Sequence, residues 1–305
     1  MLKTKTKMNS NNPFYFQVSV IIPVYNAEKY LQKAVESALQ FKEVQEVILV
    51  EDKSPDNAMV LCEKLALQDN RVQVYTHPNN ENRGAGASRN LGIEKSTCEF
   101  VAFLDADDWY LPNRFDIEKV LFKYQNIDGI YGATGFYYQK SNLIDIGKLT
   151  TVKKDVSTND LLYEFLKPNG GRFTTDAITI RKELLSKTGL FDVNLKLHQD
   201  SELFAKFIYF GNLVEGIVEK PIAYRRVHTD NRITKRNRNT ALKYHFKMLN
   251  NFIAYKNVNK KIYRILFSSF IINKTQSNNN INRFILAFKE LIANPKLIPL
   301  LLKGS

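Results

Sequence analysis

The sequence has little of what marks secreted, metal-clustered or membrane-spanning proteins. It holds 2 cysteines in 305 residues, and because Cys62 and Cys98 show neither a disulfide pattern nor metal-ligand spacing, we interpret both as structural thiols. No apolar run approaches the roughly 20 residues that a transmembrane helix needs. Residues 1–17 are polar and lack the apolar centre of a signal peptide. We therefore expect a cytoplasmic protein that begins with a flexible segment over 1–17.

Acidic residues are scarce in the C-terminal part of the chain. The net charge is +13, and residues 221–305 contain 17 Lys and Arg but only 2 acidic residues, Asp230 and Glu290. Residues 1–220 contain 27 basic and 29 acidic residues, so the whole excess belongs to the tail. A near-neutral domain with a basic tail is typical of proteins that bind an anionic surface, either lipid or nucleic acid.

A Gly-x-Gly-x-x-Gly fingerprint is also missing after the first apolar segment, which disfavours a dinucleotide cofactor. The first 104 residues instead alternate buried-strand patterns with helical patterns. We predict strands over 18–24, 47–50, 72–75 and 100–104, and helices over 28–39, 58–67 and 85–94. This alternation predicts an α/β fold, Rossmann-like, with a mostly parallel sheet flanked by helices.

The rest of the chain is less regular. We predict a polar connection over 142–160 and a strand over 177–180. The tail is helical in character over 262–272 and 281–302, and its second segment places several apolar residues on one face. These residues are Phe284, Ile285, Phe288, Leu291 and Ile292. We therefore divide the chain into a domain over 18–230, with halves 18–110 and 111–230, and a basic amphipathic helical tail over 231–305.

A group of three carboxylates follows the fourth predicted strand, where Asp105, Asp107 and Asp108 come directly after five apolar residues. Such a run is typical of a strand buried on both faces of a parallel sheet. In open α/β sheets, ligands bind at the carboxyl ends of the strands. Clustered carboxylates repel one another unless a hard cation such as Mg²⁺ or Mn²⁺ neutralises them. The alternative is that Asp107 or Asp108 caps a helix beginning near Trp109.

Four stretches in order carry a family resemblance. They are Pro23-Val24-Tyr25-Asn26, Glu51-Asp52-Lys53-Ser54-Pro55-Asp56, Asn82-Arg83-Gly84-Ala85-Gly86-Ala87-Ser88-Arg89-Asn90 and Asp105-Ala106-Asp107. Together they resemble the inverting family 2 glycosyltransferases of the GT-A fold, of the bacterial surface-polysaccharide type. The match extends from about Val18 to His228.

The resemblance implies a nucleotide-sugar site. Pro23 and Tyr25 would frame the nucleobase, Tyr25 by stacking, and Asp52 would accept a hydrogen bond from a uracil imide. Asn26 would also belong to the nucleotide-binding residues. Arg83 or Arg89 would meet the diphosphate, because a guanidinium offers paired donors to phosphate oxygens. The simpler alternatives are turn formation for Asp52 and Asp56 and a solvated surface position for either arginine. Gly84 and Gly86 allow close approach of the backbone, and Glu51 departs from the family's usual Asp.

The resemblance also implies a metal and a base. Asp105 would contact the ribose or the ion, Asp107 would hold Mn²⁺ or Mg²⁺ against the diphosphate, and His228, in Tyr224-Arg225-Arg226-Val227-His228, would approach that ion. Asp200 matches the catalytic base, although Gln199 replaces the family's Glu. A negative residue favoured by the helix dipole is the alternative for Asp200, and Glu202 is the second candidate for the base.

The activity that the resemblance implies is transfer of a sugar from a nucleotide-sugar donor, expected to be a UDP-sugar, to a glycan or lipid-linked glycan hydroxyl by single displacement. The basic tail would bind an anionic membrane surface at the inner face of the cell membrane, and no nucleic acid; a helical cap on the core is its alternative. Three other functions stay open: a nucleotidyltransferase, a nucleic-acid-binding protein and a catalytically inactive binding module.

Overall fold

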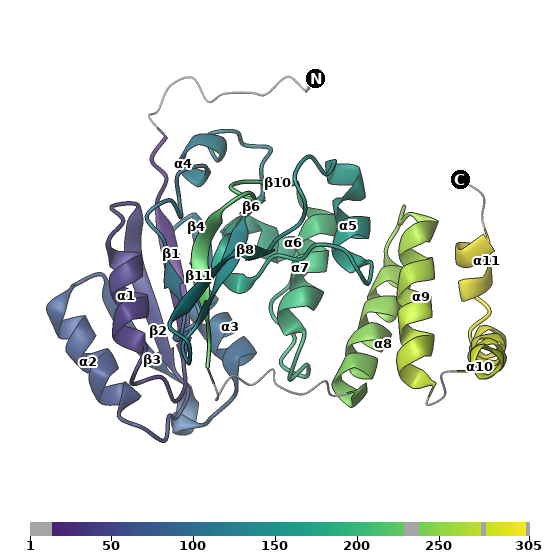
Figure 1. Cartoon of the computed structure of the whole chain (residues 1–305), viewed down its shortest axis with the longest axis horizontal. Coiled ribbons are helices and arrows are strands. Elements are labelled where there is room, and N and C mark those ends of the chain that lie inside the picture. The colour runs from purple at the N-terminus through teal and green to yellow at the C-terminus, as the bar shows by residue number, and fades with distance from the viewer. Residues whose placement is uncertain (1–13, 229–237, 276–278, 303–305) are drawn as a thin grey trace.

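The computed structural model describes residues 14–228, 238–275 and 279–302. Its centre is a seven-stranded sheet in the order β10-β6-β9-β4-β1-β2-β3 (Figure 1). β9 runs antiparallel to both of its neighbours, and the other pairs in this sheet are parallel. The strands are β1 Val18–Val24, β2 Val44–Glu51, β3 Val72–Thr76, β4 Phe100–Phe103, β6 Gly129–Tyr131, β9 Ile178–Arg181 and β10 Leu213–Glu215. The predicted α/β class with a mostly parallel sheet is confirmed.

Both faces of the central strands are covered, which explains their uninterrupted apolar sequences. In β1, Val20 and Ile22 face the core under helices α1 (Leu31–Leu39) and α2 (Ala58–Gln68), whereas Ile21 faces the opposite core. Helix α3 (Ala85–Lys95) lies very close to that second face, because a Cβ on Gly92 would come within 2.3 Å of the Ile21 side chain. The helices therefore hold β1 and β4 rigidly beneath the loops that follow them.

A second sheet of four strands, in the order β5-β11-β7-β8, lies over the first. Its strands are β5 Trp109–Tyr110, β7 Ala133–Tyr138, β8 Leu143–Thr150 and β11 Pro221–Val227. The predicted polar connection over 142–160 is wrong for β8. This strand lies at the sheet edge with most of its side chains exposed, so it has no buried face and no apolar alternation that would reveal it.

The remaining helices extend from the second half of the domain into the tail (Figure 1). They are α4 Glu118–Leu121, α5 Thr158–Leu166, α6 Leu185–Thr188, α7 Gln199–Phe210, α8 Arg238–Ala254, α9 Lys260–Lys274, α10 Asn280–Ala293 and α11 Leu297–Leu302. Buried side chains of α8 and α9, among them Met248, Phe252 and Leu266, belong to the same core as α5 and α7. These two helices therefore cap the core. The segment predicted as 281–302 is interrupted before α11 because Pro295 cannot continue a helix.

The predicted flexible segment over 1–17 lies mostly outside the described residues. At its described end, Phe16 is buried and its ring stacks on Phe122. The predicted boundary at 230 also lies outside the described residues. Within the described ranges, no helix combines the length and apolar character needed to span a membrane.

Candidate functional site

The carboxyl ends of β1, β2 and β4 open into a cavity of about 750 Å³. This is the edge of a parallel sheet at which ligands are expected. The loop before α7 and the end of β11 close the cavity from the other side. Its lining comprises residues 23–27, 30, 52, 85, 88, 89, 105–108, 175, 196–200 and 225–228. Segments that are up to 200 residues apart in the sequence therefore meet at one place.

Nearly all of the residues predicted from the sequence line this cavity. They are Pro23, Tyr25, Asn26, Asp52, Arg89, Asp105, Asp107, Asp200 and His228. The structure brings them together, and their individual roles remain predictions. Arg83 is not part of the lining, because its guanidinium lies 3.3 Å from Glu81 on an exposed part of the loop.

Asp52 organises the loop that leads into α3. Its Oδ1 accepts a hydrogen bond from the backbone N–H of Arg83 at 2.6 Å, and its Oδ2 accepts one from Gly84 at 2.8 Å. Gly84 has a φ of +83°, which a residue with a side chain would adopt only with strain. A carboxylate has about four lone-pair positions, so Asp52 can hold this loop and still accept a hydrogen bond from the cavity.

Two neighbouring acids, Glu51 and Asp56, stabilise turns, which was the simpler alternative given for Asp56. The carboxylate of Glu51 accepts hydrogen bonds from the backbone N–H groups of Lys53 and Ser54. Asp56 accepts hydrogen bonds from the backbone N–H groups of Glu28 and Ala58. Neither acid lines the cavity, so both position the loop after β2 from outside it.

Arg89 forms an ion pair with Asp105 at 2.5 Å inside the cavity. Burial of the guanidinium acts to lower the pKa of Arg89, but the carboxylate of Asp105 raises it and prevails. Arg89 therefore stays protonated. It holds the carboxylate of Asp105 in place and supplies a fixed positive charge beside it.

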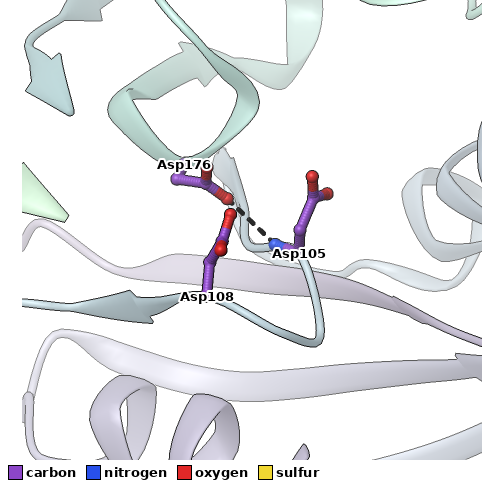
Figure 2. A group of neighbouring side chains, drawn as sticks. All are labelled: Asp105, Asp108 and Asp176. Carbon is purple, nitrogen blue, oxygen red and sulfur yellow. Dashed lines mark hydrogen bonds between the residues drawn. The ribbon is translucent and has the colours of Figure 1, made fainter. Parts of the chain in front are cut away.

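Asp105, Asp108 and Asp176 form a cluster in which one carboxylate oxygen from each residue lies within 4.8 Å of the other two (Figure 2). Asp176 comes from a short 3-10 helix, η2 (Thr175–Ala177), just before β9. Its Oδ1 accepts a hydrogen bond from the backbone N–H of Asp105 at 2.9 Å. Its buried Oδ2 accepts no hydrogen bond from any described residue. An orphaned buried oxygen beside two further carboxylates leaves a position that a cation or a proton must occupy.

The charge of this cluster is reflected in its pKa values. Burial, and then the negative charge of Asp105, raise the pKa of Asp176 to about 7. Burial, and then the charge of Asp176, raise the pKa of Asp108 well above its usual range. Carboxylate oxygens are the ligands that Mg²⁺ and Mn²⁺ prefer, so this donor set fits such an ion.

The sequence analysis missed Asp176. Its only local signal is a polar residue at the start of an apolar strand, Ala177-Ile178-Thr179-Ile180. Because β9 runs antiparallel to β4, its beginning lies at the edge where β4 ends. The direction of a strand cannot be read from its own residues, so this proximity required the fold.

Asp107 and His228, the residues predicted to hold the metal, contact each other. His228 Nε2 lies 3.0 Å from Asp107 Oδ2. Arg226 anchors the same turn, since its Nε donates to the backbone oxygen of Asp107 at 2.9 Å and its backbone N–H donates to Asp108 at 2.7 Å. Strand β11 therefore fixes the acidic turn. Among the described residues, the acidic group suited to a metal is the neighbouring cluster of Asp105, Asp108 and Asp176.

Arg225 adds a second fixed positive charge to the cavity. Burial acts to lower its pKa, but Asp108 and then Asp176 raise it and prevail. Arg225 lies on β11 and lines the cavity together with the three residues that follow it. Together with Arg89, it offsets part of the negative charge of the acidic cluster.

Asp200 lies in the first turn of α7 and lines the cavity. Its Oδ1 accepts a hydrogen bond from the backbone N–H of Ser201 at 2.7 Å. Gln199 packs tightly against α3, because a Cβ on Gly86 would come within 1.9 Å of Gln199 Oε1.

Glu202, the second candidate for the base, is fully buried outside the cavity. There Asn251 donates a hydrogen bond to it at 2.7 Å, and the Lys206 ammonium lies 3.0 Å away. Asp200 is thus the acid of this segment that faces the cavity.

The comparisons with known proteins agree with this geometry. A family model described as Glycosyl transferase family 2 matches residues 19–189. An uncharacterized glycosyltransferase of Rickettsia typhi is 33% identical over 210 residues, which are 66% of this chain and 61% of that protein. Glycosyltransferase GlyG of Streptococcus pneumoniae is 36% identical over 131 residues, 39% of this chain and 43% of that protein. The chain thus covers less than two thirds of either relative.

Solved structures share the fold. The crystal structure of S. aureus TarS 1-349 superposes with a TM-score of 0.62 at 18% identity, over 94% of this chain and 81% of that one. The mannosyltransferase PcManGT from Pyrobaculum calidifontis superposes with a TM-score of 0.56 at 14% identity, over 96% of this chain and 86% of that one. At such identities these likenesses concern the fold, and they extend over the tail helices as well.

Proposed function

Because the chain belongs to glycosyltransferase family 2, we propose that it transfers a sugar from a nucleotide-sugar donor to an acceptor hydroxyl by a metal-dependent single displacement with inversion. One observation carries this proposal. A single cavity at the carboxyl ends of the strands is lined by Asp105 and Asp108 of the acidic cluster, by Arg89 and Arg225, and by a separate carboxylate, Asp200. The cluster and the arginines suit a diphosphate, and Asp200 suits the removal of a proton from a hydroxyl.

The donor in this proposal is a UDP-sugar. Pro23, Tyr25 and Asn26 line the cavity where β1 ends, and Tyr25 is 40% exposed, which leaves ring surface for stacking on a base. Asp52 retains the capacity to accept a hydrogen bond from a uracil imide. Among the structural neighbours, TarS has been solved with UDP-GlcNAc and with UDP. PcManGT has been solved with GDP-Man and Mn²⁺, so a guanine donor is the main competitor.

Asp105, Asp108 and Asp176 would hold the divalent ion, Mn²⁺ or Mg²⁺, with the predicted ligands Asp107 and His228 next to them. When bound, such an ion offsets the negative charge that develops on the departing nucleoside diphosphate. Arg89 orients Asp105, and Arg225 supplies a second positive charge that acts on Asp108 and Asp176. Arg226 fixes the turn that carries the acidic residues, so that these groups are in place before the substrate arrives.

Asp200 acts as the general base. Its carboxylate accepts the proton of the acceptor hydroxyl while the hydroxyl oxygen forms a bond to the anomeric carbon of the sugar. The bond between that carbon and the phosphate oxygen breaks, and its electron pair leaves with the nucleoside diphosphate. Among the described residues that line the cavity, Asp200 is the carboxylate contributed by α7. A single base of this kind supports direct displacement, which inverts the anomeric configuration.

For the acceptor we propose a hydroxyl of a glycan or a lipid-linked glycan, presented at the cytoplasmic side of an anionic membrane. The support is the C-terminal part of the chain, residues 221–305, which carries all of the chain's net positive charge. A strongly basic segment is attracted to anionic lipid surfaces. The acidic cluster at the cavity would repel the phosphates of a nucleic acid, which disfavours that partner.

Release of nucleoside diphosphate from UDP-, dTDP- and GDP-sugars tests the proposal, measured with Mn²⁺, with Mg²⁺ and with a chelator. We expect one nucleotide class to be hydrolysed or transferred, with a divalent ion required, and NMR of the first product to show the inverted anomer. Turnover that a chelator leaves unchanged would contradict metal dependence. A product with retained configuration would contradict single displacement by Asp200.

A further inference from the structure

Helix α10 differs from the other tail helices in how it is packed. Whereas α8 and α9 bury large side chains in the main core, every residue of α10 is at least partly exposed. Its inner side contacts that core through Leu286, Ala287 and Leu291. Figure 1 shows α10 at the extreme end of the molecule, outside α9. One side of this helix therefore faces away from the protein.

That outward side is apolar. It carries Ile281, Phe284, Ile285, Phe288 and Ile292. Their spacing places them on one stripe of a helix with 3.6 residues per turn, and Phe284 at its border also lines a shallow pocket between α9 and α10. They are between 47% and 72% exposed, although two phenylalanines and three isoleucines normally lie in a core. An apolar stripe of this size on a protein surface marks a binding site.

The charge around this stripe indicates its partner. Residues 238–302 contain 11 Lys and Arg and one acidic residue, Glu290, which already pairs with Lys274 at 2.5 Å. Lys289 and Lys296 are exposed on and just after α10. A second copy of this chain would bring another strongly positive tail against the first, which repulsion disfavours. An anionic lipid surface offers apolar chains for the stripe and negative headgroups for the lysines.

We propose that α10 docks onto an anionic lipid bilayer, with Phe284 and Phe288 inserted below the headgroups and Lys289 and Lys296 at the headgroup level. This proposal rests on the membrane location proposed above and identifies α10 as the part of the tail that contacts the lipid. It makes no statement about the transfer reaction. It needs neither donor nor acceptor for its test. Its failure would therefore leave the glycosyltransferase proposal standing, and the reverse also holds.

The test is flotation of the full chain with vesicles of phosphatidylcholine, with and without phosphatidylglycerol. We expect binding to the vesicles that contain phosphatidylglycerol, weakened by salt. The double variant Phe284→Ser/Phe288→Ser should lower the partition coefficient by at least about tenfold. Because both side chains are exposed, the circular dichroism spectrum and donor hydrolysis should stay those of the unaltered chain.

Helix α2 supplies matched controls, because Leu67 and Lys64 are exposed there on another part of the molecule. Leu67→Ser and Lys64→Glu should leave lipid binding unchanged, whereas Lys289→Glu/Lys296→Glu should weaken it. Absence of binding by the unaltered chain would overturn the proposal, and so would binding that survives the double phenylalanine substitution. Self-association that this substitution abolishes, without any lipid binding, would overturn it in favour of a second copy.

Discussion

At the scale of single residues, the buried pair of Asp108 and Asp176 is the feature with the most consequences. Their carboxylate oxygens are close, burial raises both pKa values, and Asp176 Oδ2 accepts no hydrogen bond from the described residues. A water-accessible pair would ionise near the usual pKa of about 3.9. The metal-free native protein therefore holds a proton on this pair to higher pH than the unfolded chain does, and a bound cation would take the place of that proton.

This pair predicts how stability depends on pH. The pKa of Asp176 is about 7 in the native state and about 3.9 in the unfolded chain. Between these values the native state binds more protons, so the free energy of unfolding should fall as pH rises through this window. Thermal unfolding of the metal-free protein at about pH 5 and about pH 8 measures this. A melting temperature that rises across this interval would contradict the assignment.

The substitution Asp176→Asn should separate repulsion from metal binding. The amide oxygen can still accept the hydrogen bond from Asp105, but the negative charge is removed. We expect the metal-free variant to melt at a higher temperature than the unaltered chain at neutral pH. Saturating Mn²⁺ should stabilise the unaltered chain by about 2.7 kcal/mol at a hundredfold excess over the Kd, and the variant by much less.

Asp145→Asn is the control for this substitution, because Asp145 lies on the edge strand β8, outside the cavity. It should leave both the metal-free melting temperature and the response to Mn²⁺ unchanged. Equal stabilisation of the Asp176→Asn variant and the unaltered chain by Mn²⁺ would remove Asp176 from the proposed metal site.

Asp200→Asn should slow transfer strongly without loss of donor binding. Asparagine keeps the shape of the side chain but cannot accept the proton, so kcat should fall by roughly 10² to 10⁴. Donor affinity, measured by calorimetry, should stay the same because the removed interaction serves the transition state. Comparable loss of kcat in Glu202→Gln, with Asp200→Asn still active, would move the base to Glu202.

At the scale of the helices, the tail divides into a part that belongs to the core and a part that does not. Phe252 of α8 is fully buried, and Phe284 of α10 is 72% exposed. Phe252→Ala should lower the free energy of unfolding by about 3–5 kcal/mol, whereas Phe284→Ala should change it by less than about 0.5 kcal/mol. Urea denaturation of both variants measures the difference. Equal destabilisation would mean that α10 is also part of the core.

The elements that the sequence predicted well are those with a single clear pattern. β1 and β4 are buried on both faces, which gives each of them an apolar run. Helix α1 is buried along one stripe, which gives its apolar residues helical spacing. The edge strand β8 was missed because it has no buried face. The interruption at Pro295 was also missed, although proline disfavours a helical residue before it.

At the scale of the whole molecule, the site was predictable where motifs directly follow strands. The residues after β1, β2 and β4 meet because parallel strands end at the same edge. Asp176 was not predictable, since it depends on an antiparallel strand inserted between parallel ones. The contact of Asp107 with His228 likewise depends on β11, because this strand comes late in the sequence and ends directly before His228. Contacts of this kind are properties of the topology.

The most direct test of the central claim is calorimetric titration of UDP-, dTDP- and GDP-sugars into the full chain, with Mn²⁺ and with a chelator. We predict that one nucleotide class binds when Mn²⁺ is present, that the chelator abolishes this binding, and that Asp108→Asn loses it. Binding of equal affinity with the chelator, or no binding of any nucleotide sugar with Mn²⁺, would contradict a metal-dependent donor site in this cavity.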